Sequence, residues 1–104
     1  MHLRARYEQA VRDLRDRAAE MQRNGASAET IARSLHAERQ RLAAFFKQQT
    51  PEPYRLRILE RNVRVYGSES GPSIEFLRAA GRSWERIIDG ATRPGPPVGM
   101  EPDP

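Results

Sequence analysis

The sequence predicts an all-α fold, a compact bundle of about five helices followed by a disordered Pro/Gly-rich C-terminal tail. No segment alternates apolar and polar residues as a strand does. Apolar residues instead recur at steps of three and four, and Gly or Pro separates the periodic stretches. We expect a single helical domain at residues 1–93, with a core module at about 50–93 and the disordered tail at 94–104.

The first helix is expected to end at Gly25, a typical helix stop. Its apolar residues form one stripe on an otherwise charged helix: Leu3, Tyr7, Ala10, Leu14, Ala18 and Met21. Ser27 then supplies an N-cap for a second helix, which ends near Thr50. The stripe of this helix consists of Ile31, Leu35, Leu42, Phe45 and Phe46.

A third helix is expected from about Pro53 to Tyr66, with Gly67 as the residue that follows its end. Its apolar face comprises Leu56, Leu59, Val63 and Tyr66, widened by Ile58 and Val65. The sequence therefore predicts that this face packs against the bundle.

Pro72 can open a fourth helix that runs to Ala80 and is stopped by Gly81. Ser83 caps a fifth helix, which we expect to be buried through Trp84, Ile87 and Ile88. Arg93 follows the last turn of that helix, where its side chain can satisfy the final carbonyl groups.

The segments "MQRNGASAETI" and "LRAAGRSWERI" repeat one pattern. The matching residues are Met21, Gly25, Ser27 and Ile31 in the first and Leu77, Gly81, Ser83 and Ile87 in the second. A helix, a Gly turn and a capped helix are typical of a helix-turn-helix. The same pattern is also the simplest way to end one helix and begin another.

The charge distribution favours a polyanionic or acidic partner. The formal net charge is +4, and of the 18 basic residues all except Lys47 are Arg. The basic excess lies within the first 66 residues, whereas the tail is purely acidic. Arg matches phosphate and carboxylate geometry well, although a GC-rich genome would also favour Arg codons.

Several classes of site are disfavoured by the residues themselves. The chain has no Cys, which excludes thiol catalysis and disulfides, and His2 and His36 lie far apart in sequence. We therefore expect no metal site and no cofactor. No apolar run approaches the ~20 residues that cross a bilayer, so we expect no membrane segment, and no signal peptide ahead of the first helix.

The third helix carries basic residues at i, i+4 and i+7, namely Arg57, Arg61 and Arg64. Tyr54 lies one turn earlier and Asn62 lies beside the row. Guanidinium groups near an aromatic ring suit a nucleic-acid backbone whose bases can stack on the ring. The alternative is a solvated face on which Glu60 pairs with Arg64.

Residues from about 50 to 95 resemble the C-terminal effector module of bacterial polymorphic toxins of the rearrangement-hotspot and contact-dependent inhibition type, with a looser match upstream at "NGASAETIARSLHAER". The matching positions are Arg61, Asn62, Tyr66, Gly67, Gly71, Pro72, Leu77, Gly81, Ser83, Trp84, Ile87, Ile88, Ala91, Arg93 and Gly95. The turn departs from the family pattern, because Ser68, Glu69 and Ser70 replace an Asp-Pro-Leu segment.

The resemblance implies a toxin that is delivered from a bacterium and acts in the cytoplasm of the target cell. It also implies a nuclease activity that is neutralised by a cognate immunity protein. We hypothesise a metal-independent ribonuclease, for which transfer RNA is one candidate substrate, and an acidic immunity protein as the partner of the basic surface. The alternative is a non-enzymatic helical module that binds nucleic acid or adapts one protein to another.

Under the ribonuclease hypothesis, RNA is the partner and each candidate residue has a role. The phosphate is held by Arg57, Arg61 and Arg93 and oriented by Asn62, while Tyr66 or Tyr54 stacks on a base or transfers a proton. His36 is the candidate general base, with a packing role beside the second stripe as the alternative. Arg64 and Arg86 complete the nucleic-acid-binding set.

Overall fold

The structure of the chain is a computed structural model that describes residues 2–95. Five helices and no strands are found in that range, which confirms the predicted all-α fold class. The predicted disordered tail lies, from residue 96 onward, outside the described residues.

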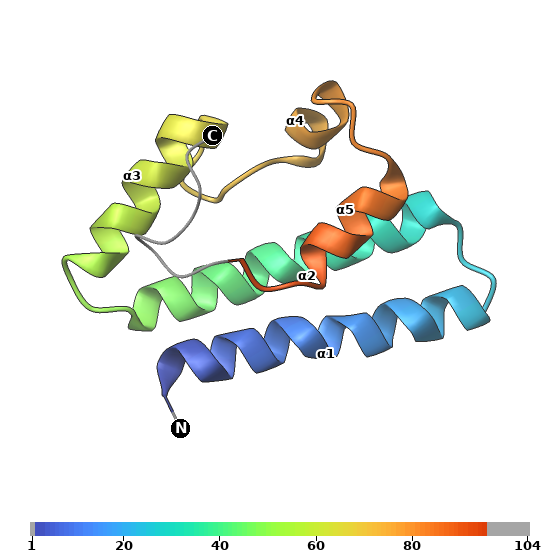
Figure 1. The fold of residues 1–104 in the computed structure, drawn as a ribbon, viewed down its shortest axis with the longest axis horizontal. Helices are drawn as coiled ribbons and strands as arrows, with labels where there is room; N and C mark the ends of the chain where they lie inside the picture. Colours follow the sequence, from blue (N-terminus) through green and yellow to red (C-terminus); the bar gives the residue numbers. More distant parts are fainter. Residues whose placement is uncertain (1, 96–104) are drawn as a thin grey trace.

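Two long helices, α1 (Leu3–Arg23) and α2 (Ala28–Gln49), lie side by side in opposite directions (Figure 1). Gly25 turns the chain between them with a φ of 86°. The Ala26 N–H donates to the Met21 carbonyl over 3.0 Å, and the Ser27 hydroxyl accepts from the Thr30 N–H over 3.1 Å. The predicted stop and cap are therefore confirmed as a Schellman motif followed by an N-cap.

The repeated pattern produces the same turn a second time, between α4 (Ile74–Ala79) and α5 (Trp84–Ala91). Gly81 has a φ of 85°, and the Arg82 N–H donates to the Leu77 carbonyl over 3.1 Å. The Ser83 hydroxyl accepts from the Arg86 N–H over 3.2 Å. In the α1–α2 pair this pattern joins two antiparallel helices, so there it serves to end one helix and begin the next.

The core forms where α5 rests on the α1–α2 pair (Figure 1). Its buried apolar side chains are Val11, Leu14, Ile31, Ala32, Leu35, Leu77, Ile87 and Ala91. The predicted burial of Trp84 is only partial. Its indole contacts the Arg33 and Arg78 guanidinium groups, whose carbon atoms lie 5.1 and 4.1 Å from the ring centre.

Helix α3 (Tyr54–Tyr66) leads away from the C-terminal end of α2 and stands outside this core (Figure 1). The prediction that its apolar face packs against the bundle is wrong at Leu56 and Val63, which are 51% and 49% exposed. The side of α3 that carries Asn62 instead faces the turn that contains Glu69. Asn62 is buried because its amide finds a carbonyl partner there.

Two smaller expectations also differ from the structure. The fourth helix begins at Ile74, not at Pro72, because the Ser73 hydroxyl accepts from the Phe76 N–H over 3.0 Å and so caps it.

Phe45, assigned to the stripe of the second helix, is largely exposed, whereas Phe46 packs edge-on against Tyr7 with ring centres 5.5 Å apart. The stripe therefore reaches the core only as far as Leu42.

Candidate nucleic-acid interface

Helix α3 has well-defined ends, which hold its basic side chains in a fixed register. At its start, one oxygen of the Glu52 carboxylate accepts from the Leu56 N–H over 3.2 Å, while the other pairs with Arg55 over 2.7 Å. At its end, Gly67 adopts a φ of 75° and its N–H donates to the Val63 carbonyl over 2.9 Å. The residues between these points therefore form one continuous helix.

Three guanidinium groups of α3 form what we call the arginine face, which consists of Arg57, Arg61 and Arg64. Arg57 and Arg64 are exposed, and Arg61 is half-buried. Among residues 2–95, none of the three forms an ion pair, in contrast to Arg55 with Glu52 or Arg93 with Asp89. The alternative, an ion pair between Glu60 and Arg64, is not formed within residues 2–95. The arginine face therefore keeps its positive charge.

An exposed aromatic ring accompanies the arginine face. Tyr54 is 53% exposed in the first turn of α3, and the guanidinium carbon of Arg57 lies 5.7 Å from its ring centre. Tyr54 and Arg57 are therefore close to each other, as the sequence predicts. Such a pair offers a phosphate partner and a stacking surface for a base at one place.

Lys47, which sequence reasoning did not select, lies beside Arg61. Burial lowers the pKa of the Lys47 ammonium group, Glu69 opposes this effect, and the positive charge of Arg61 lowers the pKa further. The Nε atom of Arg61 is buried without a hydrogen-bond partner among residues 2–95. Lys47 is the chain's only lysine and lies in the last turn of α2, but nothing in the sequence places it beside Arg61.

Asn62 lies next to this pair of cations but faces inward. Its amide Nδ2 donates to the Glu69 carbonyl over 2.9 Å, and Lys47 Nζ donates to the same carbonyl over 2.9 Å. The amide that was expected to orient a phosphate thus positions the turn after α3. Its side chain is only 6% exposed.

His36 lies on the same side of α2 as Lys47 but eleven residues earlier, ~16 Å away along the helix axis. It is 8% exposed, and its Nε2 has no hydrogen-bond partner in the described range. Burial lowers the pKa of the imidazole and Arg39 reinforces this, whereas the Pro72 backbone and Glu75 oppose it. The expected general base is therefore separated from the arginine face.

Tyr66 and the two α5-associated arginines are also placed away from the arginine face. Tyr66 packs edge-on against Phe76 of α4, with ring centres 5.5 Å apart. Arg93 pairs with Asp89 over 2.9 Å, and Arg86 is exposed on α5. The structure therefore does not gather these three residues with Arg61 into one site.

The expectation that Arg93 satisfies the last carbonyls of α5 is wrong. Arg39 Nη1 from α2 donates to the carbonyls of Gly90 and Ala91 over 3.0 and 3.2 Å and also to that of Arg93 over 3.0 Å. Arg39 Nε donates to the Tyr7 hydroxyl over 2.9 Å. The guanidinium that bonds these carbonyls is therefore that of Arg39, while the Arg93 side chain donates to the Asp89 carboxylate over 2.9 Å.

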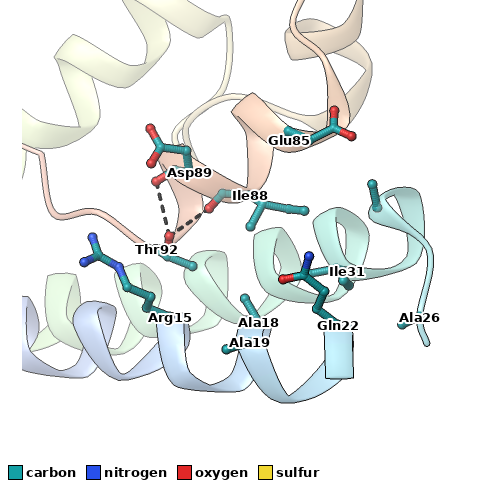
Figure 2. A pocket seen from close by; sticks show the side chains of 11 residues that line it. Arg15, Ala18, Ala19, Gln22, Ala26, Ile31, Glu85, Ile88, Asp89 and Thr92 are labelled. Atoms are coloured by element: carbon teal, nitrogen blue, oxygen red, sulfur yellow. Dashed lines mark hydrogen bonds between the residues drawn. The ribbon is translucent and has the colours of Figure 1, made fainter. Parts of the chain in front are cut away.

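An open groove of about 450 Å³ lies between α1 and α5 and contains none of the predicted site residues (Figure 2). Small side chains of Ala18 and Ala19 face Ile88 across it, and Arg15 and Glu85 stand at its rim. The hydroxyl of Thr92 at this groove is already bonded to the carbonyls of Ile88 and Asp89, over 3.0 and 3.3 Å. The polar side chains of this groove are Arg15, Gln22, Glu85, Asp89 and Thr92, so it lies apart from the arginine face of α3.

The described residues contain no group of three or more His, Cys, Asp or Glu side chains that could hold a metal ion. In the same range, no helix is both long enough and apolar enough to cross a membrane. Comparisons of the chain with models of known protein families, with curated proteins and with solved structures found no match.

Proposed function

We propose that this chain is an effector domain of a bacterial polymorphic toxin that acts on RNA and binds it through the arginine face of α3. The observation that carries the proposal is the absence of a carboxylate partner for Arg57, Arg61 and Arg64 among the described residues. Several other arginines of the described range, such as Arg33, Arg55 and Arg93, are paired with a neighbouring Asp or Glu. Unpaired guanidinium groups on one helix face are suited to a row of phosphates.

Single-stranded RNA fits this surface better than a duplex. The exposed ring of Tyr54 adjoins Arg57, and an unpaired base can stack on such a ring while its phosphate meets the guanidinium. The toxin assignment is supported by the resemblance of residues from about 50 to 95. It includes delivery into the cytoplasm of a target cell and neutralisation by a cognate acidic immunity protein.

Binding can be tested with a fluorescein-labelled single-stranded oligoribonucleotide of 12 nucleotides and its DNA counterpart, by anisotropy at several salt concentrations. Three phosphate contacts predict that log K falls with log salt with a slope of about −2. The triple variant Arg57→Gln, Arg61→Gln, Arg64→Gln should lose most of this slope. Absence of binding by the wild type at low salt would overturn the proposal.

A control of equal charge is provided by Arg15, Arg23 and Arg82. These side chains are exposed and, within residues 2–95, also have no carboxylate partner. Their replacement by Gln should leave the affinity close to that of the wild type. If both triple variants lose the same affinity, the binding reflects net charge and the arginine face has no special role.

Ribonuclease activity is the second candidate, and the position of Lys47 favours it. A half-buried amine with a lowered pKa beside Arg61 is a candidate proton acceptor next to a candidate phosphate site. In RNA cleavage a base removes the 2′-OH proton, the 2′ oxygen bonds to phosphorus, and the 5′ oxygen leaves with a proton. Arg61 would stabilise the charge that develops on the phosphate.

The test is incubation with total bacterial RNA and with plasmid DNA, each with and without EDTA, resolved on a gel. We expect discrete RNA fragments that persist in EDTA. Lys47→Met should abolish them and retain oligoribonucleotide binding. Intact RNA at high protein concentration would overturn the ribonuclease hypothesis, while the anisotropy measurement would still decide the binding proposal.

A further inference from the structure

A second side of α3 presents apolar residues to solvent. Leu56 and Val63 lie two turns apart on one side of the helix and are 51% and 49% exposed. Leu59 and Tyr66 continue this side and are half-buried. We name these four residues, Leu56, Leu59, Val63 and Tyr66, the apolar face of α3.

The chain itself makes little use of this face. The only α3 residue that is buried within the described range is Asn62. Phe76, which is 40% exposed, lies beside Tyr66 and extends the apolar surface. Large apolar side chains that adjoin one another on a protein surface mark an interaction site.

The face is complementary to itself. Its residues are spaced by three, four and three positions, so the pattern reads the same from either end of the helix. A two-fold axis at the midpoint of α3 would lay a second copy antiparallel to the first. It would set Leu56 against Tyr66 of the second copy and Leu59 against Val63, as an isologous interface requires.

We propose that the apolar face of α3 is the interface of a homodimer with an antiparallel α3 pair at its centre. Charges at one edge of the face support a second copy as the occupant. Glu60 has no ion-pair partner among residues 2–95, and neither has Arg64. The two-fold axis brings Glu60 of each copy within one turn of Arg64 of the other copy. Along this edge of the dimer, the two Glu60 carboxylates then lie between the guanidinium groups of the two Arg64 and the two Arg57 side chains.

The size of the face predicts a weak dimer. A 13-residue helix is ~20 Å long, and one such helix pair buries on the order of 800 Å² in total. Stable interfaces bury at least about 1,200 Å², so we expect this dimer to be weak and reversible. The monomer and dimer should both be populated in a purified sample.

The two-fold axis also places both arginine faces on the same side of the dimer. This consequence, unlike the interface, rests on the proposed RNA binding. A single-stranded oligoribonucleotide long enough to contact both faces should favour the dimer over the monomer, because it binds the dimer at two sites. A failure of this effect with dimerisation intact would count against the RNA proposal only.

Sedimentation equilibrium of the full chain between 10 µM and 1 mM tests the dimer without RNA. We expect the average mass to rise from the monomer toward the dimer over this range. Leu56→Lys and Val63→Lys should each keep the chain monomeric, and Phe45→Lys, at another exposed apolar residue, should not. A wild type that stays monomeric to 1 mM would overturn the proposal and leave the face to a different protein.

The charged edge provides a second test that does not depend on apolar contacts. Glu60→Arg should abolish dimerisation because it places six guanidinium groups around the axis. The double variant Glu60→Arg, Arg64→Glu should restore it, since the opposite charges meet again in exchanged positions. Thermal melting by circular dichroism checks that every variant is folded. A dimer that is indifferent to Glu60→Arg, or that Phe45→Lys breaks, would show that the interface lies elsewhere.

Discussion

Lys47 and Asn62 donate hydrogen bonds to the same oxygen atom, the backbone carbonyl of Glu69, each over 2.9 Å. The two donors come from α2 and α3, and the acceptor lies in the turn that follows α3. This shared carbonyl therefore ties three segments together at the base of the arginine face. It also explains why Arg61, whose neighbour in sequence is Asn62, is held beside Lys47.

Removal of the Asn62 amide should destabilise this junction. Asn62→Ala leaves a buried cavity and one donor fewer, and we expect a loss of about 1–3 kcal/mol in the free energy of unfolding. Lys47→Met keeps the aliphatic stem and should cost less than about 1 kcal/mol, because Lys47 is only half-buried. Urea unfolding of both variants measures the difference. Equal losses, or a larger loss for Lys47→Met, would contradict this ranking.

The stability of the fold should fall as the pH falls below about 6.5, the ordinary pKa of His36. Burial lowers the pKa of His36 in the folded chain, so the unfolded chain takes up the proton first. Above pH 6.5 the ring is neutral in both the folded and the unfolded chain and does not change the free energy of unfolding. Below pH 6.5 the free energy of unfolding decreases until the pH passes below the pKa of His36 in the folded chain. Glu75 and Arg39 are the charged side chains that act on this ring, in opposite directions.

Urea unfolding between pH 5.5 and 8 checks this behaviour. The slope of stability against pH should vanish in His36→Gln, which retains a polar side chain of similar size and does not titrate. His2→Gln is the matched control, because His2 is exposed at the start of α1. An unchanged slope in His36→Gln would exclude His36 as its source.

The turns of this protein could be predicted from sequence because their causes are local. Gly25 and Gly81 each lie between an apolar residue four positions earlier and a Ser two positions later, and each forms the same hydrogen-bonded stop. Such a motif depends on no distant segment. The helix boundaries at Ser27 and Ser83 were predictable for the same reason.

The candidate site was only partly predictable because its remaining features depend on contacts between distant segments. The spacing of Arg57, Arg61 and Arg64 defines a helix face, but nothing in it identifies Lys47, which meets Glu69 only in the folded chain. Periodicity also marked Leu56 and Val63 as apolar positions without indicating that no described segment covers them. The period of a helix shows which residues share a side but not what lies opposite.

Arg39 should be among the most important polar residues for stability. Its guanidinium bonds to three carbonyls at the end of α5 and to the Tyr7 hydroxyl, so it links α1, α2 and α5. We expect Arg39→Met to reduce the free energy of unfolding by about 2–3 kcal/mol. Arg39→Lys should recover little of it, because an ammonium group cannot reproduce the planar fork.

Arg41→Met is the matched control for Arg39. Its guanidinium is largely exposed and lies 3.5 Å from the Glu38 carboxylate, an interaction that contributes ~0–1 kcal/mol. Urea unfolding of the two Met variants should therefore separate them clearly. A loss for Arg41→Met as large as that for Arg39→Met would show that the α5 carbonyls are not the cause.

Replacement of glycine by alanine should have opposite effects at two nearby positions. Gly81 has a φ of 85°, and an added Cβ would meet nothing within 4 Å. Its conversion to Ala therefore costs only the strain of a left-handed backbone, about 1–2 kcal/mol. Gly90 lies in the last turn of α5 with ordinary helical geometry and equally open surroundings, so Gly90→Ala should stabilise the fold by up to ~1 kcal/mol. Thermal unfolding of the two variants would contradict this account if both shifted the midpoint in the same direction.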